Sequence, residues 1–167
     1  MIDQVTAHHL FEYKDGNLYW KNPVHKKNLG KIVGYDNGYG YKKVSIEGKQ
    51  CYVHRIVYLM QHGTMPKTID HIDGNSSNNA IENLRPANTS QNMMNSVKKQ
   101  KNTSGYRNVF PNKERDTWVV YITINKKTKF FGSYEDVELA GLVAEEARRK
   151  YHGEFFSTRS INNANNY

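Results

Sequence analysis

Hydrophobic and polar positions alternate over short distances in the first half of the chain, which predicts short strands and hairpins. Residues 10–22 predict two strands around an Asp-Gly turn, and residues 39–54 predict a second hairpin around a Glu-Gly turn. The pattern then changes to helical spacing from about His54 to His62, and Gly63 is a typical residue to end that helix.

A polar stretch, residues 68–92, follows this helix and is crowded with asparagine and aspartate. Apolar residues recur in it only near residues 69–72 and 81–84. We therefore expect a hairpin with a long asparagine-rich connection. A short helix should follow, starting at Thr89 or Ser90, which are both good N-caps.

The last part of the chain, residues 104–160, has a separate pattern. The segments YRNVF, TWVVYITIN and KTKFFGSY predict three successive strands. A helix is predicted at residues 135–151, because its apolar residues recur at spacings of three and four. Ser133 with Asp136 has the spacing of a capping box at the start of this helix.

These elements predict an α+β protein with two domains. The N-terminal domain, residues 1–97, has β-hairpins and a helix ahead of a ββα unit. Residues 98–104 form a basic linker. The C-terminal domain, residues 105–167, is expected to be a three-stranded antiparallel sheet packed on one helix.

Composition narrows the class of partner. The chain has 24 Lys and Arg against 16 Asp and Glu, a formal net charge of +8, which favours a polyanion such as nucleic acid. Hydrophobic residues make up 37% of the chain, so the core is modest. No run approaches about 18 apolar residues, and no signal peptide is visible, so we expect a cytoplasmic protein without a membrane partner. The single cysteine, Cys51, excludes an internal disulfide and a cysteine-rich zinc site.

Charge is unevenly divided within the C-terminal domain. Residues 107–131 carry six basic and two acidic side chains, whereas residues 135–150 carry three basic and five acidic ones. DNA should therefore meet the sheet rather than the helix, although a solvated sheet face and a solvated linker are also consistent with the sequence. The expected DNA-contacting residues are Arg107, Tyr121, Thr123, Asn125, Lys127 and Lys129 in the domain, and Lys98, Lys99 and Lys101 in the linker.

The polar stretch contains the groups that phosphodiester hydrolysis needs. His71 can act as a general base when neutral, and Asp70 beside it can hold a divalent metal. Asn83 comes 12 residues after His71, and its amide oxygen can accept a hydrogen bond from the imidazole. Asn92, nine residues further on, offers a second oxygen ligand. Oxygen ligands of this kind suit Mg²⁺, with Mn²⁺ as an alternative, and no zinc is expected.

Other polar residues of the stretch have structural interpretations. Asp73, Gly74 and Asn75 are typical of a tight turn. Asn78 and Asn79 are expected to cap the connection or bond its backbone.

The segments IDHIDGN, NNAIENLR and SQNMMN resemble the HNH motif of phage-encoded endonucleases, in the variant that ends in asparagine. The resemblance implies a ββα-metal active site. It makes His71 the general base, Asp70 and Asn92 the metal ligands, and Asn83 the residue that orients His71. His54 matches a recurring position of these proteins, and we interpret it as a packed histidine at the helix start.

Residues 104–160 resemble the plant ethylene-response-factor type of DNA-binding domain through SGYRNV, TWVVYI, FGSYEDVELAGLVAEEA and YHGEF. That family binds the major groove through its three-stranded sheet. Arg107 matches a DNA-contacting arginine of the family. Phe110, Tyr121, Thr123 and Phe130 stand where the family has arginine, glutamate or tryptophan, so its target sequence does not carry over.

Together these features predict a metal-dependent endonuclease acting on double-stranded DNA. The two resemblances suggest a homing or free-standing phage enzyme in the cytoplasm of an infected bacterium. One active site per chain suits nicking by a monomer, and double-strand cleavage would need a homodimer or two successive events. The alternative is a non-catalytic, sequence-specific DNA-binding regulator on a nuclease-like scaffold. An RNA-binding protein has little support, because the sheet shows no stacking signature in its sequence.

Overall fold

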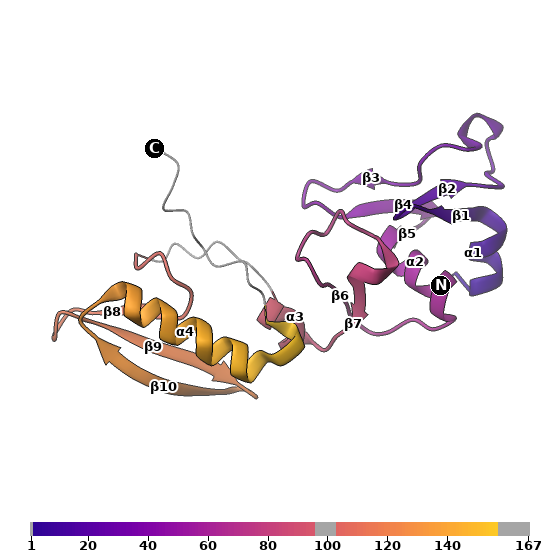
Figure 1. The fold of residues 1–167 in the computed structure, drawn as a ribbon. Coiled ribbons are helices and arrows are strands. Elements are labelled where there is room, and N and C mark those ends of the chain that lie inside the picture. The colour runs from indigo at the N-terminus through magenta and orange to yellow at the C-terminus, as the bar shows by residue number, and fades with distance from the viewer. Residues whose placement is uncertain (1, 96–102, 157–167) are drawn as a thin grey trace. The chain divides into compact units, whose positions relative to one another are not determined.

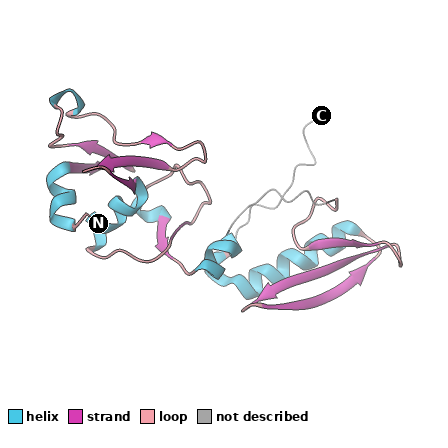
Figure 2. Ribbon diagram, turned by 180° about the vertical axis from the view of Figure 1, so that it is seen from behind, coloured by secondary structure: helices cyan, strands magenta, loops and turns pink. Residues whose placement is uncertain are grey.

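The computed structural model describes residues 2–95 and 103–156, and it is a mixed α/β structure. Within these ranges there are four α-helices and several small sheets (Figures 1 and 2). The chain divides into two compact units, Met1–Asn88 and Thr89–Tyr167. Most of the predicted basic linker, with Lys98, Lys99 and Lys101, lies outside the described residues. Of the described helices, none is long and apolar enough to cross a membrane.

The first unit opens with a helix that the hydrophobic pattern did not predict. Helix α1, Gln4–Leu10, begins at Asp3, whose carboxylate accepts a hydrogen bond from the Thr6 amide at 2.7 Å. The predicted hairpin follows as β1, Phe11–Lys14, and β2, Asn17–Trp20, paired antiparallel. The Asp-Gly turn expected between these strands is thereby confirmed.

A three-stranded antiparallel sheet comes next, in the order β3-β4-β5. Strand β3 is Tyr35–Asp36, β4 is Lys42–Ile46 and β5 is Lys49–Tyr52. Helix α2, Val53–His62, starts directly after β5 and ends at Gly63 in the left-handed region, with φ of 69°. A glycine adopts this conformation without strain, which explains why the helix stops there.

The core of the first unit lies between α2 and the N-terminal strands. Helix α2 buries most of its apolar residues, and its main neighbours are α1, β4 and β5. A short 3₁₀ turn, Lys26–Asn28, lies in the loop that follows β2. The most deeply buried side chains are Phe11, Leu18, Val33, Val53, Ile56 and Val57.

The polar stretch forms the predicted hairpin. Strand β6, Ile69–His71, pairs antiparallel with β7, Leu84–Pro86. A 3₁₀ turn, Ile81–Asn83, leads the asparagine-rich connection into β7. Helix α3, Thr89–Asn95, follows in the chain, as expected, but it belongs to the second compact unit.

The second unit contains the predicted three strands and helix. Strands β8, Val109–Asn112, β9, Thr117–Ile124, and β10, Lys127–Tyr134, form an antiparallel sheet in the order β10-β9-β8. Helix α4, Val137–His152, covers one face of this sheet, and a 3₁₀ turn, Gly153–Phe155, follows it (Figure 1). Their shared core consists of Val109, Val120, Ile122, Ala140, Ala144 and Ala147.

The start of α4 corrects one prediction. Asp136 is the N-cap, and its carboxylate accepts from the amides of Glu138 at 2.6 Å and Leu139 at 3.1 Å. The predicted capping box with Ser133 is wrong. Ser133 is still part of β10, and its hydroxyl donates to that of Thr117 at 2.8 Å. The bulge in β10 between Phe130 and Gly132 adds a residue to that strand, and α4 begins correspondingly later in the chain.

Candidate active site and DNA-contacting residues

The candidate active site is built on β6, which carries Asp70 and His71 in succession. Both side chains are buried, with 3% and 5% of their surface exposed. Ile69 on one strand and Leu84 on the other are packed into the core and fix this hairpin in place. A carboxylate and an imidazole are thus held on a short, rigid strand.

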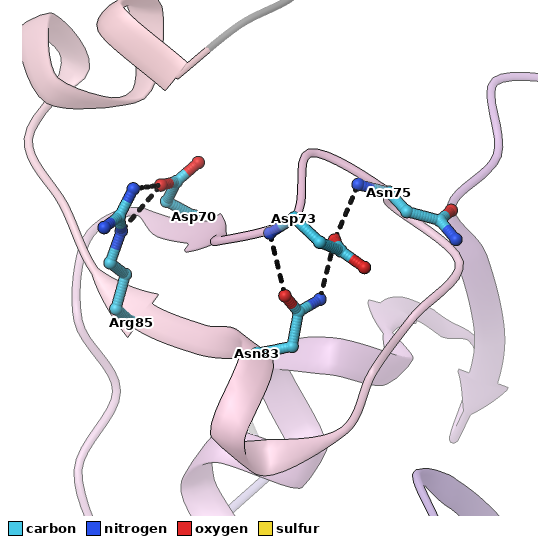
Figure 3. Close-up of polar contacts among 5 residues, drawn as sticks. All are labelled: Asp70, Asp73, Asn75, Asn83 and Arg85. Atoms are coloured by element: carbon cyan, nitrogen blue, oxygen red, sulfur yellow. Dashed lines mark hydrogen bonds and ion pairs between the residues drawn. The ribbon is translucent and has the colours of Figure 1, made fainter. Parts of the chain in front are cut away.

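Asp70 forms an ion pair with Arg85, its cross-strand partner in β7. The Arg85 Nη2 and Nε atoms lie 2.8 Å and 2.9 Å from the same carboxylate oxygen, Oδ2 (Figure 3). Such a pair offsets the cost of burying the carboxylate. The sequence analysis missed Arg85, although opposite charges facing each other across a hairpin were a usable signal.

His71 is bonded to a residue that the sequence analysis did not select. Its Nε2 lies 3.1 Å from the Oδ1 of Asn79, which is 3% exposed. An amide oxygen only accepts, so Nε2 carries the proton and the lone pair of the neutral ring is on Nδ1. The predicted bond from His71 to Asn83 is wrong. Asn79, which was expected to cap the connection or bond its backbone, bonds the His71 ring.

The protonation state of His71 follows from its surroundings. Burial lowers the pKa of His71, while the bond to Asn79 and the negative charges of Asp73 and Asp70 act in the opposite direction. Burial has the largest effect, so the imidazole is neutral near pH 7. A neutral imidazole is the form that a general base requires.

Asn83 holds the connection together instead. Its Oδ1 accepts from the Asp73 amide at 2.9 Å, and its Nδ2 donates to the Asp73 carboxylate at 2.9 Å and to the Asn78 carbonyl at 2.8 Å. Asp73 also accepts from the Asn75 amide at 2.8 Å, which confirms the predicted tight turn (Figure 3). Asn83 therefore shapes the loop that carries Asn79.

Long-range hydrogen bonds attach this polar loop, residues 72–83, to the N-terminal part of the same unit. The Ile81 amide donates to the Tyr13 hydroxyl at 2.9 Å. The Ser77 hydroxyl donates to the Gly40 carbonyl at 2.7 Å. The loop is irregular, yet its ends and its middle are fixed by groups of the same unit.

His54 packs against His71. Its ring centroid is 5.1 Å from that of His71, and the Tyr41 ring lies 5.7 Å from His54 and 5.9 Å from His71. Burial lowers the pKa of His54 to about 3, with smaller contributions from the charge that His71 carries when protonated and from the charge of Arg55. His54 is thus the packed, neutral histidine expected at the start of α2.

The residues proposed as metal ligands supply hard oxygen atoms. In the described part of the chain, no group of three or more His, Cys, Asp or Glu side chains could hold a metal ion. An ion bound by Asp70 would therefore take most of its ligands from water and substrate, which suits Mg²⁺. Asn92 is half-buried in α3, in the second unit, so its place beside Asp70 stays a prediction.

The strand register corrects the expected position of two lysines in the sheet, and their contact with DNA stays a prediction. Lys127 faces Ile124 and Lys129 faces Ile122 across the β9–β10 ladder. Cross-strand partners share a face, and Ile122 is buried against α4, so both lysines lie on the helix-facing side. Lys129 Nζ is 5.5 Å from the ring of Tyr151 in α4, which agrees with this placement.

The other predicted DNA-contacting residues of this unit lie in different places. Tyr121 and Thr123 are exposed on the face of the sheet away from α4, as predicted. Asn125 lies in the turn after β9, with φ of 50°, and not on the sheet face. Arg107 precedes β8 and donates through Nη2 to the Met93 carbonyl at 3.0 Å. Burial lowers the pKa of Arg107, so it is not the exposed strand arginine that we expected.

Comparison with known proteins gives a family match over the segment that carries the candidate site. Residues 51–94 match the family model described as HNH endonuclease. The matched segment includes Asp70, His71, Asn79 and Arg85. The chain is also 36% identical over 104 residues to Protein 3.8 of Escherichia phage T7, an alignment that covers 61% of this chain and 85% of that protein. No solved structure gave a significant match.

Proposed function

Because this chain belongs to the family of Protein 3.8 of Escherichia phage T7 and carries an HNH endonuclease family domain, we propose that it is a metal-dependent endonuclease that hydrolyses DNA phosphodiester bonds. The observation that supports this most directly is the neutral, buried His71, oriented by Asn79 and adjacent to Asp70. A regulator without catalysis has no use for an oriented base beside a buried carboxylate.

We further propose that β6, β7 and α3 together form a ββα-metal centre. The three elements follow one another in the chain in the required order. In this arrangement Asp70 and Asn92 would hold a Mg²⁺ ion. Bound there, the ion supplies Lewis-acid stabilisation of charge on the phosphate and on the departing oxygen.

The protein's own groups supply the remaining steps. His71 takes a proton from the attacking water at Nδ1, and the water is thereby made nucleophilic. Asn79 accepts from Nε2–H, so it fixes the ring and stabilises the positive imidazolium that forms. Arg85 holds the Asp70 carboxylate in one orientation through its two contacts with Oδ2.

The test is cleavage of supercoiled plasmid by the purified full chain. We expect conversion to open circles with Mg²⁺ and none with EDTA. His71→Ala should lower the rate about 100- to 10,000-fold, because the general base is lost, while DNA binding measured by gel shift is retained. His25→Ala is the matched control, since His25 is an exposed histidine at a 3₁₀ turn.

Three outcomes test the role of His71, the alternative of a non-catalytic regulator, and nicking. Cleavage by His71→Ala within a few-fold of wild type would reject His71 as the base. DNA binding without any cleavage by the wild type with Mg²⁺ or Mn²⁺ would favour the non-catalytic regulator. Open circles that accumulate before linear DNA would support nicking by one active site per chain.

A further inference from the structure

The sheet β3-β4-β5 of the first unit has one side in the core and one side towards solvent. Val44 of β4 is 5% exposed and belongs to the core. Lys43, next to it in the same strand, therefore lies on the other side. Its cross-strand partners, Tyr35 in β3 and Tyr52 in β5, share that side. We call this side the tyrosine face; it also carries Tyr41, whose ring centroid is 5.7 Å from that of Tyr52.

The tyrosine face extends to the candidate general base. The Tyr41 ring lies 5.9 Å from the His71 ring. The Tyr52 ring lies 5.4 Å from that of His54, which in turn packs on His71. A molecule bound at His71 can therefore continue across these rings without leaving the surface of the same unit.

Lys43 holds its ammonium group over an aromatic ring. Nζ is 4.8 Å from the centroid of the Tyr52 ring, a distance at which a cation is attracted to the ring face. The side chain is half-buried, and none of the ion pairs formed among the described residues includes it. An ammonium group that is held in place in this way suits an anion supplied by a ligand, and phosphate is the anion that lysine commonly binds.

Other cationic side chains near the site contact oxygen atoms of the protein. Arg85 forms the ion pair described above, and Arg55 donates to two backbone carbonyls at 3.0 Å and 3.2 Å. Lys42 lies on the opposite side of β4 and donates from Nζ to the Asn17 Oδ1 at 3.3 Å. Of these four side chains, Lys43 is the one that contacts a ring instead of an oxygen atom in the described structure.

We propose that Lys43 binds a backbone phosphate of the substrate DNA, on the cleaved strand and close to the scissile phosphate. The proposal rests on the proposed function as a DNA endonuclease. Each strand of a duplex carries a phosphate about every 3.4 Å along the axis, so a strand with one phosphate at His71 presents others to the tyrosine face. The Tyr52 ring restricts the ammonium group before DNA binds, which reduces the entropy lost on binding. Lys43 thereby fixes the register of the strand over the general base.

The first experiment compares Lys43→Met with Lys42→Met, which remove the same charge from adjacent positions. Binding of the full chain to a duplex is measured by fluorescence anisotropy in EDTA at several salt concentrations. Loss of one phosphate contact lowers the slope of log affinity against log salt by about 0.9, which we expect in Lys43→Met. Lys42→Met and Lys43→Arg should keep the wild-type slope. A wild-type slope in Lys43→Met overturns the proposal, and so does an equal decrease in the two methionine variants, because net charge alone would then explain it.

Uncharged phosphate analogues test the position of the contact. In a duplex that carries the mapped cleavage position, single phosphates of the cleaved strand are replaced by methylphosphonates. Replacement of one phosphate near the cleavage position should raise the KM of the wild type several-fold and leave the KM of Lys43→Met unchanged. A retained kcat in Lys43→Met shows that this variant is folded. If every replacement changes the wild type and Lys43→Met to the same extent, the proposed contact is rejected.

The two proposals fail separately, because the salt dependence is measured without a metal ion. If the wild type cleaves plasmid with Mg²⁺ but Lys43→Met keeps the wild-type slope, only the Lys43 contact is rejected. If Lys43→Met has the lower slope and the wild type cleaves nothing, the endonuclease function is rejected and Lys43 remains a DNA-binding residue.

Discussion

The polar loop, residues 72–83, and the outer face of the C-terminal sheet differ in how their side chains are held. The outer face is the face away from α4, and it carries Phe110, Tyr121 and Phe130. In the loop, asparagine and aspartate side chains bond one another, and the base that they serve is buried. On the outer face, aromatic side chains are exposed and touch mainly a cross-strand neighbour. The proposed general base therefore depends on a network of hydrogen bonds, whereas the exposed side chains of the outer face make separate contacts.

This difference determines how substitutions should combine. Removing one member of a buried network leaves its partner unsatisfied, which costs about 1–3 kcal/mol and couples neighbouring positions. Exposed positions separated along a sheet contribute almost independently. The experiments below test this contrast, beginning with the largest expected effect.

The ion pair of β6 and β7 should couple activity to stability. Asp70→Ala should abolish measurable plasmid cleavage, because the anionic metal ligand is lost. It should also lower the free energy of unfolding by about 3 kcal/mol, because Arg85 is left charged in a largely buried site. Urea unfolding followed by circular dichroism measures this cost.

The double variant Asp70→Ala/Arg85→Ala separates the two effects. It should regain most of the lost stability, since no uncompensated charge remains, yet still not cleave DNA. If the double variant loses as much stability as the two single variants together, the pair is not coupled.

Asn79 should act as a positioning residue for His71. Asn79→Ala should slow cleavage about 10- to 100-fold, which is typical when the group that orients a functional imidazole is removed. Asn79→Asp keeps an acceptor but adds negative charge, which raises the pKa of His71. The acid limb of its pH–rate profile should therefore move to higher pH, because the neutral base then forms only at higher pH.

The control for this series is Asn75→Ala, a substitution of an exposed asparagine in the same loop. It should leave the pH–rate profile unchanged. If the profile of Asn79→Asp also coincides with that of the wild type, Asn79 does not act on His71.

His152 should make the second unit sensitive to acid. Burial, and then the charges of Arg107 and Arg148, lower the pKa of His152 to about 4. The unfolded chain binds the proton near pH 6.5 and the folded chain does not, so stability is complete above pH 6.5 and is lost as the pH falls towards 4. The thermal midpoint of this unit should fall over that range, and less so in His152→Gln.

A single tryptophan can report on that unit. The chain has two tryptophans, Trp20 in the first unit and Trp118 in the second, so Trp20→Phe leaves Trp118 emission as the probe. His25→Gln in the same background should keep the wild-type pH dependence. An unchanged pH dependence in His152→Gln would contradict the assignment.

The smallest effect is expected on the outer face. Tyr121→Ala and Phe130→Ala should each lower the free energy of unfolding by no more than about 1 kcal/mol, because cross-strand aromatic pairs contribute little more. Thermal unfolding monitored by circular dichroism measures it. A loss of several kcal/mol would mean that the pair belongs to the fold rather than to a binding surface.

Most regular elements could be predicted from the sequence, because each has a local signal. Helix α2 has an apolar face and a C-terminal glycine, and the hairpins have turn residues in the left-handed region. Helix α1 was missed, since it is short and only Ala7 in it is buried. Its signal was the N-cap at Asp3 rather than its hydrophobic pattern.

The positions of Lys127 and Lys129 could not be predicted without the length of one turn. Asn125 and Lys126 both have positive φ, 50° and 65°, and form a two-residue turn. Lys127 then pairs with Ile124, and every second side chain of β10 is directed towards α4. A turn longer by one residue would have placed both lysines on the outer face.

In the candidate site, the spacing of residues identified the cluster but not the hydrogen-bond partner of His71. Spacing along the chain selected Asp70, His71 and Asn83, which lie close together in the structure. Spacing did not distinguish Asn79 from Asn83 as the partner of His71, because side-chain directions in an irregular loop depend on its hydrogen bonds. Those bonds, from Asn83 to Asp73 and Asn78, became visible only in the folded loop.

The hydrogen bond from the Ile81 amide to the Tyr13 hydroxyl has a consequence for folding kinetics. It joins residues 68 positions apart, and the Ser77 contact with Gly40 spans 37. Contacts of such long range form late, after local helices and hairpins, because the intervening chain must first be ordered. The polar loop should therefore acquire its final shape only when the N-terminal hairpin is in place. Tyr13→Phe should delay the recovery of cleavage during refolding more than the recovery of helical circular dichroism.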